Sequence, residues 1–213
     1  MPKTKYAPAT ERNRQPILEV LQKVLPDSGT VLEIASGTGE HAVFFAPRLP
    51  HLQWLPSEPQ EVMRESIHAW RQALPARNLL APVALDVSTR PWPTERPAEQ
   101  TDEYEPPELT ITAIVNINMV HICAWEMCER LMAGAERVLS AGGILYLYGP
   151  FKQGGRHTAP SNESFDAMLR DRNSDWGVRD LEAVIAIAQQ HHLQHVETIP
   201  MPANNLSVVF RRD

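Results

Sequence analysis

The sequence is poor in the features that mark secreted, membrane-spanning and nucleic-acid-binding proteins. It has only two cysteines among 213 residues, and the spacing of Cys123 and Cys128 matches neither a CxxC redox pair nor a zinc ligand pattern. We therefore expect two buried free thiols in a reducing cytosol. No apolar run approaches the ~20 residues of a membrane span, and segment 1–16 lacks the apolar core of a signal peptide. These absences predict a cytoplasmic protein.

The chain also lacks an excess of positive charge. Its formal net charge is −6, whereas a nucleic-acid partner usually requires a basic face, so we expect no such partner. His191, His192 and His195 stand close together but have no matching acid, and we predict no metal site. The length suits one domain over 1–213, and it leaves both a monomer and a homodimer open.

Helical and strand patterns alternate along the chain. Spacing of apolar residues predicts helices at 16–25, 40–48, 60–74, 122–140, 162–172 and 179–192. Short β-branched or apolar runs predict strands at 30–35, 52–58, 80–87, 109–120, 142–151, 195–202 and 205–212. Segment 90–107 carries five prolines and a run of acids, which exclude an ordinary helix and indicate a surface loop.

This order predicts an α/β fold built on a mostly parallel sheet of seven strands with helices on both faces. The last two strands are joined too tightly for a crossover helix, so the last strand should run antiparallel. In such sheets ligands bind beyond the carboxyl ends of the strands, where the strand order reverses.

The turn after the first strand is the strongest functional signal. "VLEIASGTGEHA" satisfies the dinucleotide pattern G-x-G-x-x-G/A through Gly37, Gly39 and Ala42, and Glu58 follows at the distance of a ribose-binding acid. Glu33, however, lies in the strand before the turn, where a carboxylate repels a pyrophosphate and attracts a cationic ligand. Both a dinucleotide and S-adenosylmethionine, which has no phosphate, stay open on the turn alone.

At this point the chain resembles a known family. "VLEIASGTGEH" is similar to the first motif of class I S-adenosylmethionine-dependent methyltransferases, and Glu58 and Asp86 match the acids after their second and third strands. "ATERNRQPILEVL", "NINMVHI", "YLYGPF" and "NNLSVVFRR" resemble the methyltransferase-like 26 family, also known as domain of unknown function 938. Ala35 stands where many class I members have glycine.

The resemblance implies a cofactor site and a Rossmann-like class I methyltransferase fold. S-adenosylmethionine would be the cofactor and S-adenosylhomocysteine the product. Expected cofactor-binding residues are Glu33, Ala35, Gly37, Gly39, Glu58, Asp86, Val87 and Asn116. Glu33 would meet the methionine ammonium, Glu58 the ribose hydroxyls, and Asp86 with Val87 the adenine.

Other polar residues are candidates for the acceptor side. Asn116 and Asn118 alternate on one strand and should share a face, where they need hydrogen-bond partners. His121 follows and is a candidate general base, against the commoner role of a core or capping histidine. Tyr148 lies toward the end of the fifth predicted strand, and acceptor pockets form after this strand in the fold that the chain resembles.

Arg12 and Asn13 precede the first predicted helix. The resemblance implies that residues 1–15 fold over the cofactor site as a lid, which would exclude water and bind a substrate carboxylate or phosphate. The alternative is a solvated arm.

The sequence therefore predicts a methyltransferase with an unidentified acceptor, a small molecule or a protein side chain. Two alternatives stay open. One is an NAD(P)-dependent oxidoreductase, based on "GTGEHA" and Glu58. The other is a non-catalytic interaction protein of the same fold, with the 90–107 loop as its contact.

Overall fold

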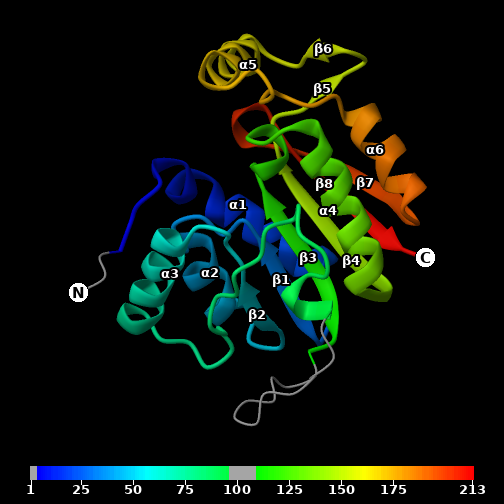
Figure 1. Ribbon diagram of the computed structural model, residues 1–213. Coiled ribbons are helices and arrows are strands. Elements are labelled where there is room, and N and C mark those ends of the chain that lie inside the picture. The colour runs from blue at the N-terminus through cyan, green and yellow to red at the C-terminus, as the bar shows by residue number, and fades with distance from the viewer. Residues whose placement is uncertain (1–3, 96–108) are drawn as a thin grey trace.

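The computed structural model describes residues 4–95 and 109–213, and its framework is a six-stranded sheet in the order β2-β1-β3-β4-β8-β7 (Figure 1). The strands are β1 (Thr30–Ile34), β2 (Gln53–Pro56), β3 (Ile111–Ile117), β4 (Leu139–Gly149), β7 (Leu193–Met201) and β8 (Asn205–Arg212). β1 pairs in parallel with β2 and β3, and β3 with β4. β8 runs antiparallel to both β4 and β7. The predicted mostly parallel sheet with an antiparallel last strand is confirmed.

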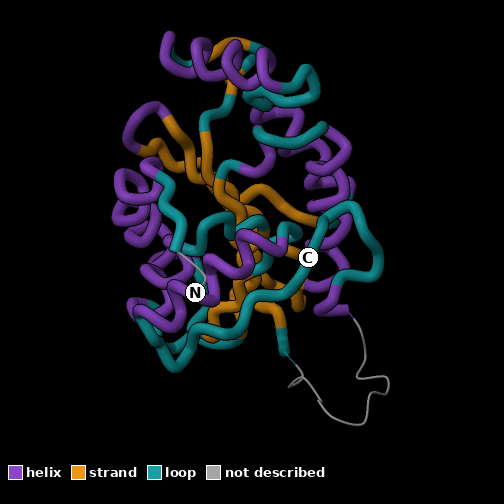
Figure 2. Tube along the Cα trace, turned by 60° about the vertical axis from the view of Figure 1, so that its left-hand side comes forward, coloured by secondary structure: helices purple, strands orange, loops and turns teal. Residues whose placement is uncertain are grey.

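Helices cover both faces of this sheet, as predicted (Figures 1 and 2). One face carries α1 (Pro8–Val24), α2 (Glu40–Phe45) and α3 (Glu61–Ala73), and the other carries α4 (Trp125–Val138) and α6 (Leu181–Gln190). β1 sends Val31 into the apolar cluster on the first face and Leu32 and Ile34 into the cluster on the second. A central parallel strand is buried on both faces, and all five residues of β1 are buried.

A small cap stands beyond the carboxyl end of β4, at the top of Figure 1. It consists of β5 (Lys152–Gln153), β6 (Arg156–His157) and α5 (Pro160–Arg172). The buried side chains of α5 are mostly polar. Among them, the Asp166 carboxylate accepts a hydrogen bond from Val178 N at 2.7 Å and lies 3.3 Å from Lys152 Nζ. Polar contacts therefore supply much of what holds the cap.

Short 3₁₀ helices complete the described part of the chain: η1 (Ala46–Arg48), η2 (Pro93–Glu95), η3 (Met119–His121) and η4 (Pro202–Asn204). None of the helices within residues 4–95 and 109–213 combines the length and the apolar character needed to cross a membrane.

The strand predicted at 80–87 is wrong, and the sheet has six strands instead of seven. The segment runs beside β2 and pairs with it only at isolated bridges, Trp54 with Leu79 and Ser57 with Val83. Pro82 lies between the two bridges, and its missing N–H removes a ladder hydrogen bond where a strand would have to continue. The segment still delivers Asp86 to the edge of the sheet.

The N-terminal region also differs from the prediction. α1 begins at Pro8 and continues through Pro16, although Pro16 was expected in the first turn. Residues 8–15 of the expected lid are therefore helical. Ahead of them, Lys5 N donates to Ser66 Oγ at 2.8 Å and Trp70 Nε1 donates to Lys5 O at 3.0 Å. The residues before Pro8 are thus tied to α3, and residues 1–3 lie outside the described range.

Segment 85–95 is clamped against α4. Trp92 is fully buried, and Glu95 receives hydrogen bonds from Arg137 Nε at 2.6 Å and Arg137 Nη2 at 3.1 Å. These contacts anchor the chain that follows Asp86. Residues 96–107 of the predicted proline-rich loop lie outside the described residues.

A substitution at Gly134 of α4 tests the packing of segment 85–95 against this helix, here called the clamp. A Cβ on Gly134 would lie 1.9 Å from Trp92 Cζ2. Alanine normally stabilises a helix interior relative to glycine by ~1 kcal/mol, but here we expect Gly134→Ala to lower the free energy of unfolding by about 1–3 kcal/mol through overpacking. Urea denaturation measures the difference.

The control repeats the substitution in a Trp92→Ala background, where the steric conflict is gone. There Gly134→Ala should be neutral or stabilising. A Gly134→Ala single variant as stable as the parent protein would contradict the clamp.

Candidate functional site

The turn between β1 and α2 has a backbone that side chains rarely tolerate. Ala35, Gly37 and Gly39 have φ of 56°, 55° and 90°, all in the left-handed region that glycine adopts without penalty. A Cβ on Gly39 would lie 2.8 Å from Ile67 Cγ1 of α3, whereas one on Gly37 would meet nothing within 4 Å. Gly39 is thus required for packing against α3, while the side of Gly37 is open to a ligand. Ala35 adopts this left-handed backbone although its Cβ makes the conformation unfavourable, at the position where many class I methyltransferases have glycine.

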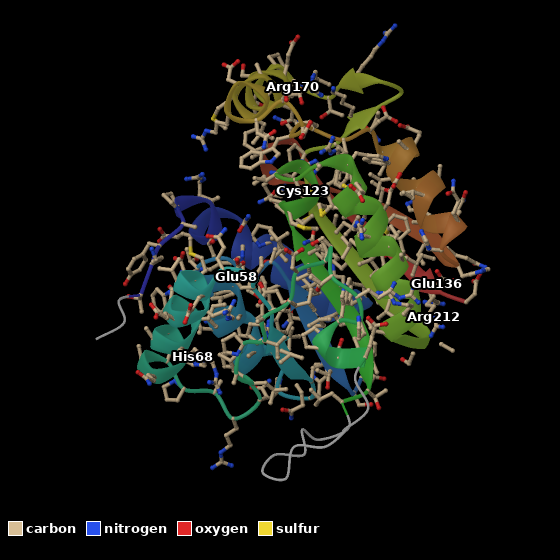
Figure 3. All side chains as sticks on the ribbon, in the orientation of Figure 1. Glu58, His68, Cys123, Glu136, Arg170 and Arg212 are labelled. Carbon is tan, nitrogen blue, oxygen red and sulfur yellow. The ribbon has the colours of Figure 1, made fainter. Side chains whose placement is uncertain are left out.

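Glu58 ties this turn to the end of β2 and is labelled in Figure 3. Its Oε2 accepts a hydrogen bond from Gly37 N at 3.0 Å, and its Oε1 accepts one from Gln60 N at 3.2 Å. Burial raises the pKa of the Glu58 carboxyl, and the two amides and Arg64 act against that rise. The carboxylate is therefore held in place by the backbone of the turn itself.

Glu33 lies beneath the turn. Trp54 Nε1 donates to its Oε2 at 2.9 Å, and the residue is 2% exposed. Burial raises the pKa of Glu33 to about 7, with hydrogen bonds to Trp54 and Ser36 opposing the rise. An acid buried at this cost, in a strand that could have carried valine, indicates a requirement other than stability.

A cavity of about 420 Å³, here called the edge cavity, opens where the strand order reverses between β1 and β3. Its wall brings together four of the predicted cofactor-binding residues, namely Ala35, Glu58, Asp86 and Val87. The carboxylate of Asp86 is exposed, and its Oδ1 accepts a hydrogen bond from Ser88 N at 2.8 Å. Gly37 adjoins the cavity through its hydrogen bond to Glu58. The other predicted cofactor-binding residues, Glu33, Gly39 and Asn116, do not line the cavity.

The opposite wall of the edge cavity was not predicted. It consists of apolar and sulfur-containing side chains from the last residue of β3 and from the segment after it: Ile117, Met119, Ile122, Cys123 and Met127. Cys123, labelled in Figure 3, is only partly buried, unlike Cys128. The expectation of two buried thiols is therefore wrong for Cys123. In a fold of this kind, ligands bind beyond the carboxyl ends of the two strands at which the strand order reverses, here β1 and β3. Applying this rule to the segment after β3 would have placed these residues at the site.

Asn116 joins the ends of β1 and β3. It is fully buried, its Nδ2 donates to Ile34 O at 3.1 Å, and its Oδ1 has no partner among the described residues. Buried acceptors are nearly always paired, so this oxygen is suited to a ligand donor.

Asn118 does not share a strand face with Asn116, contrary to the prediction. β3 ends at Ile117, and Asn118 has φ of 65°. This left-handed residue sends its side chain into a second cavity, whereas its neighbours Ile117 and Met119 line the edge cavity. Asn118 therefore stands between the two cavities.

The second cavity, here called the cap cavity, measures about 800 Å³ and lies between α1, the cap and η4. It brings together Arg12, Asn13, Asn118 and Tyr148, the residues predicted for the substrate or lid. Asn118 N donates to Tyr148 O at 2.8 Å, which joins the ends of β3 and β4. Burial raises the pKa of the Tyr148 hydroxyl, so it is a neutral group that can both donate and accept.

The geometry gives no support to His121 as a general base. The ring is fully buried and packs edge-on against Phe151 at 4.7 Å between centroids. Its Nδ1 accepts a hydrogen bond from Arg179 N at 3.2 Å, and burial lowers the pKa of His121 to about 3. A base this weak and enclosed is poorly placed to take a proton from a substrate.

The three clustered histidines are engaged in local contacts, and Glu136 faces two of them, so the expectation that they have no matching acid is wrong. His192 Nε2 lies 3.7 Å from Glu136 Oε1. His191 Nδ1 lies 2.9 Å from Glu136 Oε2, and His195 Nε2 lies 2.9 Å from Thr198 Oγ1. Within the ranges that the structure describes, no group of three or more histidine, cysteine or acidic side chains is placed to hold a metal ion.

Solved structures of methyltransferases share this fold. The O-methyltransferase family 2 protein from Planctomyces limnophilus, in complex with apigenin, has a TM-score of 0.74 at 18% identity over 96% of this chain and 60% of its own. Human N-acetylserotonin methyltransferase, in complex with S-adenosylmethionine, has a TM-score of 0.73 at 11% identity over 96% and 52%. CalO1, a methyltransferase in calicheamicin biosynthesis bound to S-adenosylhomocysteine, has a TM-score of 0.68 at 16% identity over 96% and 55%.

The chain spans about half to three fifths of the length of these proteins, and identity this low establishes the fold alone. The predicted Rossmann-like class I methyltransferase fold is thereby confirmed. A family model, described as "Protein of unknown function (DUF938)", matches residues 4–212. Because that match spans nearly the whole sequence, the chain belongs to the DUF938 family, which is the family that the sequence motifs resemble.

Proposed function

We propose that the protein binds S-adenosylmethionine at the edge cavity and transfers its methyl group to a small molecule or a protein side chain. The observation that carries the proposal is that backbone amides of the turn between β1 and α2 already donate hydrogen bonds to acceptors within the protein. Ser36 N, Gly37 N and Gly39 N donate to Ser57 O, Glu58 Oε2 and Ser36 O, respectively. A phosphate-binding turn needs such amides to face its ligand, and here they are bonded within the protein.

The charges around the turn favour the same ligand. Glu33, Glu58 and Asp86 surround it with carboxylates, which attract an ammonium or sulfonium and repel a pyrophosphate. The volume of about 420 Å³ lies within the range of ~300–1,000 Å³ typical of small-molecule sites. An acidic, apolar-walled cavity at the switch point of the sheet suits a cationic nucleoside.

Each residue of the site has a role that its hydrogen bonding allows. Carboxylate oxygens accept two hydrogen bonds each, so Glu58 can receive the ribose hydroxyls while it keeps Gly37 and Gln60. We assign the adenine to Asp86 and Val87. We assign the amino-acid end to Asn116, whose buried Oδ1 has no partner among the described residues. Glu33, whose pKa burial raises to about 7, supplies negative charge beneath the turn above that pH.

The bound cofactor would supply a methyl group already activated on a sulfonium. The protein's remaining task is alignment, because a well-oriented transfer needs little acid–base assistance. Asn118 stands between the edge cavity and the cap cavity, so the two cavities adjoin. Residues of the cap cavity can therefore hold the acceptor. The enclosed position of His121 is consistent with a reaction that uses no histidine base.

Similar proteins favour oxygen as the accepting atom, since the names of several describe O-methyltransferases.

No contact of the described residues favours an NAD(P)-dependent oxidoreductase. The non-catalytic alternative depends on the 90–107 loop, of which residues 96–107 lie outside the described range.

Binding of the cofactor is tested first. Isothermal titration calorimetry with S-adenosylmethionine, S-adenosylhomocysteine and NADH should show micromolar binding of the first two only. Glu58→Gln should weaken both by about ten- to a hundredfold, because it replaces charge-assisted hydrogen bonds with neutral ones.

Glu129→Gln is the matched control, since Glu129 is exposed and lies outside the edge cavity. It should bind as the parent protein does. NADH binding without S-adenosylmethionine binding would refute the proposal.

The buried acid gives a pH-dependent prediction. The pKa of Glu33 rises from 4.5 to about 7 on folding, so between these values the folded protein keeps a proton that the unfolded chain has lost. This contribution lowers the free energy of unfolding as pH rises through that window, by about 3 kcal/mol at most. Glu33→Gln should remove it, making the variant more stable than the parent above pH 7 but weaker in S-adenosylmethionine binding.

Urea denaturation at pH 5 and pH 8, with calorimetry at pH 8, measures both effects. Glu129→Gln should change neither. A Glu33→Gln protein that binds the cofactor like the parent at pH 8 would show that the buried acid does not serve the cofactor.

A further inference from the structure

The cap cavity has a distinctive electrostatic character. Of the described residues in its wall, Arg12 is the only one with a charged side chain, and no aspartate or glutamate is among them. Arg12 makes no ion pair or hydrogen bond within the described ranges. Its neighbour Glu11 lines a different groove, on the other side of α1. In a chain of net charge −6, the described wall of this cavity therefore carries one positive side chain and no negative one.

The α1 side of the cavity presents hydrogen-bond donors. Burial lowers the pKa of His41 to about 3, which keeps its ring neutral. His41 Nε2 lies 2.8 Å from Asn13 Oδ1, so the histidine donates and the Asn13 oxygen is occupied. The Asn13 amide also hydrogen-bonds to the Tyr148 hydroxyl. It therefore has one N–H group left to offer beside the guanidinium of Arg12, which carries five donors in a planar fork.

The opposite side presents acceptors. Asn162 Nδ2 donates to Asn204 O at 2.9 Å, and Asn204 Nδ2 donates to Ser161 Oγ at 3.2 Å. Asn205 Nδ2 donates to Pro202 O at 3.1 Å. With their amide nitrogens engaged by the protein, these asparagines have side-chain oxygens left for a ligand. The cavity is thus polarised, with donors on α1 and acceptors on α5 and η4.

The remaining wall is apolar and of limited size. Pro16, Pro150, Phe165 and Pro202 contribute flat, rigid surfaces. A volume of about 800 Å³ is that of a small-molecule site. The occupant should therefore have a compact apolar body between its two polar ends.

We propose that the cap cavity binds a small organic anion, with its carboxylate or phosphate on Arg12 and Asn13 and a hydroxyl or amine directed toward the asparagines of α5 and η4. This inference rests on the proposed function, in which such an anion is the methyl acceptor. Guanidinium and carboxylate or phosphate match in bidentate geometry, so Arg12 selects the anion and the asparagines select its donor end.

Calorimetry on the protein saturated with S-adenosylhomocysteine tests the inference with three probes: 4-hydroxybenzoate, phenyl phosphate and the neutral 4-hydroxybenzamide. We expect at least one anion to bind about tenfold or more tightly than the amide. The stronger of the two anions identifies carboxylate or phosphate as the preferred group. Arg12→Gln should abolish the preference for the anion, and Arg12→Lys should keep part of it.

Arg77→Gln is the matched control, because Arg77 is exposed and outside the cavity wall. It removes the same charge and should leave all three affinities unchanged. Unaltered binding of S-adenosylhomocysteine to Arg12→Gln shows that the variant is folded.

Two results would overturn the inference: neither anion binds the parent protein more tightly than the amide, or the preference survives in Arg12→Gln. Failure of the parent protein to bind S-adenosylhomocysteine is a separate result that overturns the proposed function. The two failures are therefore distinguishable.

Discussion

The hydrogen bond from Gly37 N to the Glu58 carboxylate is the contact on which the site depends. It closes the end of β1 onto the end of β2 and holds Glu58 at the cavity wall. It also consumes a turn amide that a phosphate would need. Glu33 is buried beneath the turn. The turn therefore matches a dinucleotide-binding pattern in sequence but has acidic side chains around it. Under the proposed function, the carboxylates of Glu58 and Glu33, more than the glycines, decide which ligand the site binds.

The residues of the site that cost stability lie within the sheet and at the end of one of its strands. Glu33 lies in a strand whose other residues pack into the two apolar clusters or pair with neighbours, and Trp54 both fills the core and donates to it. Ala35 carries a left-handed backbone without being glycine. Such locally unfavourable choices persist where the surrounding structure compensates for them. Here the compensation comes from a parallel sheet buried on both faces.

Much of this was predictable from sequence because it is local. The strand, turn and helix at 30–48, the acid after β2 and the antiparallel last strand follow from periodicity and short connections. The failures are non-local or concern single backbone groups. Pro82 interrupts a strand that its apolar neighbours predict, and the left-handed backbone of Asn118 ends β3 early and redirects a side chain. Arg12 and Tyr148 were predicted on the acceptor side from the family resemblance and do line one cavity. Their spacing in the sequence does not reveal this, because it depends on the packing of α1 against the sheet.

The polar attachment of the cap has an evolutionary consequence. β5, β6 and α5 form one continuous stretch of chain, inserted between β4 and α6 and fixed largely by Asp166 and by Asn162. That stretch contributes to the cap cavity but not to the edge cavity. Substitutions, insertions or deletions there can therefore change the lining of the cap cavity while the lining of the edge cavity stays constant. In this architecture, sequence drift in one continuous segment can alter one cavity without altering the other.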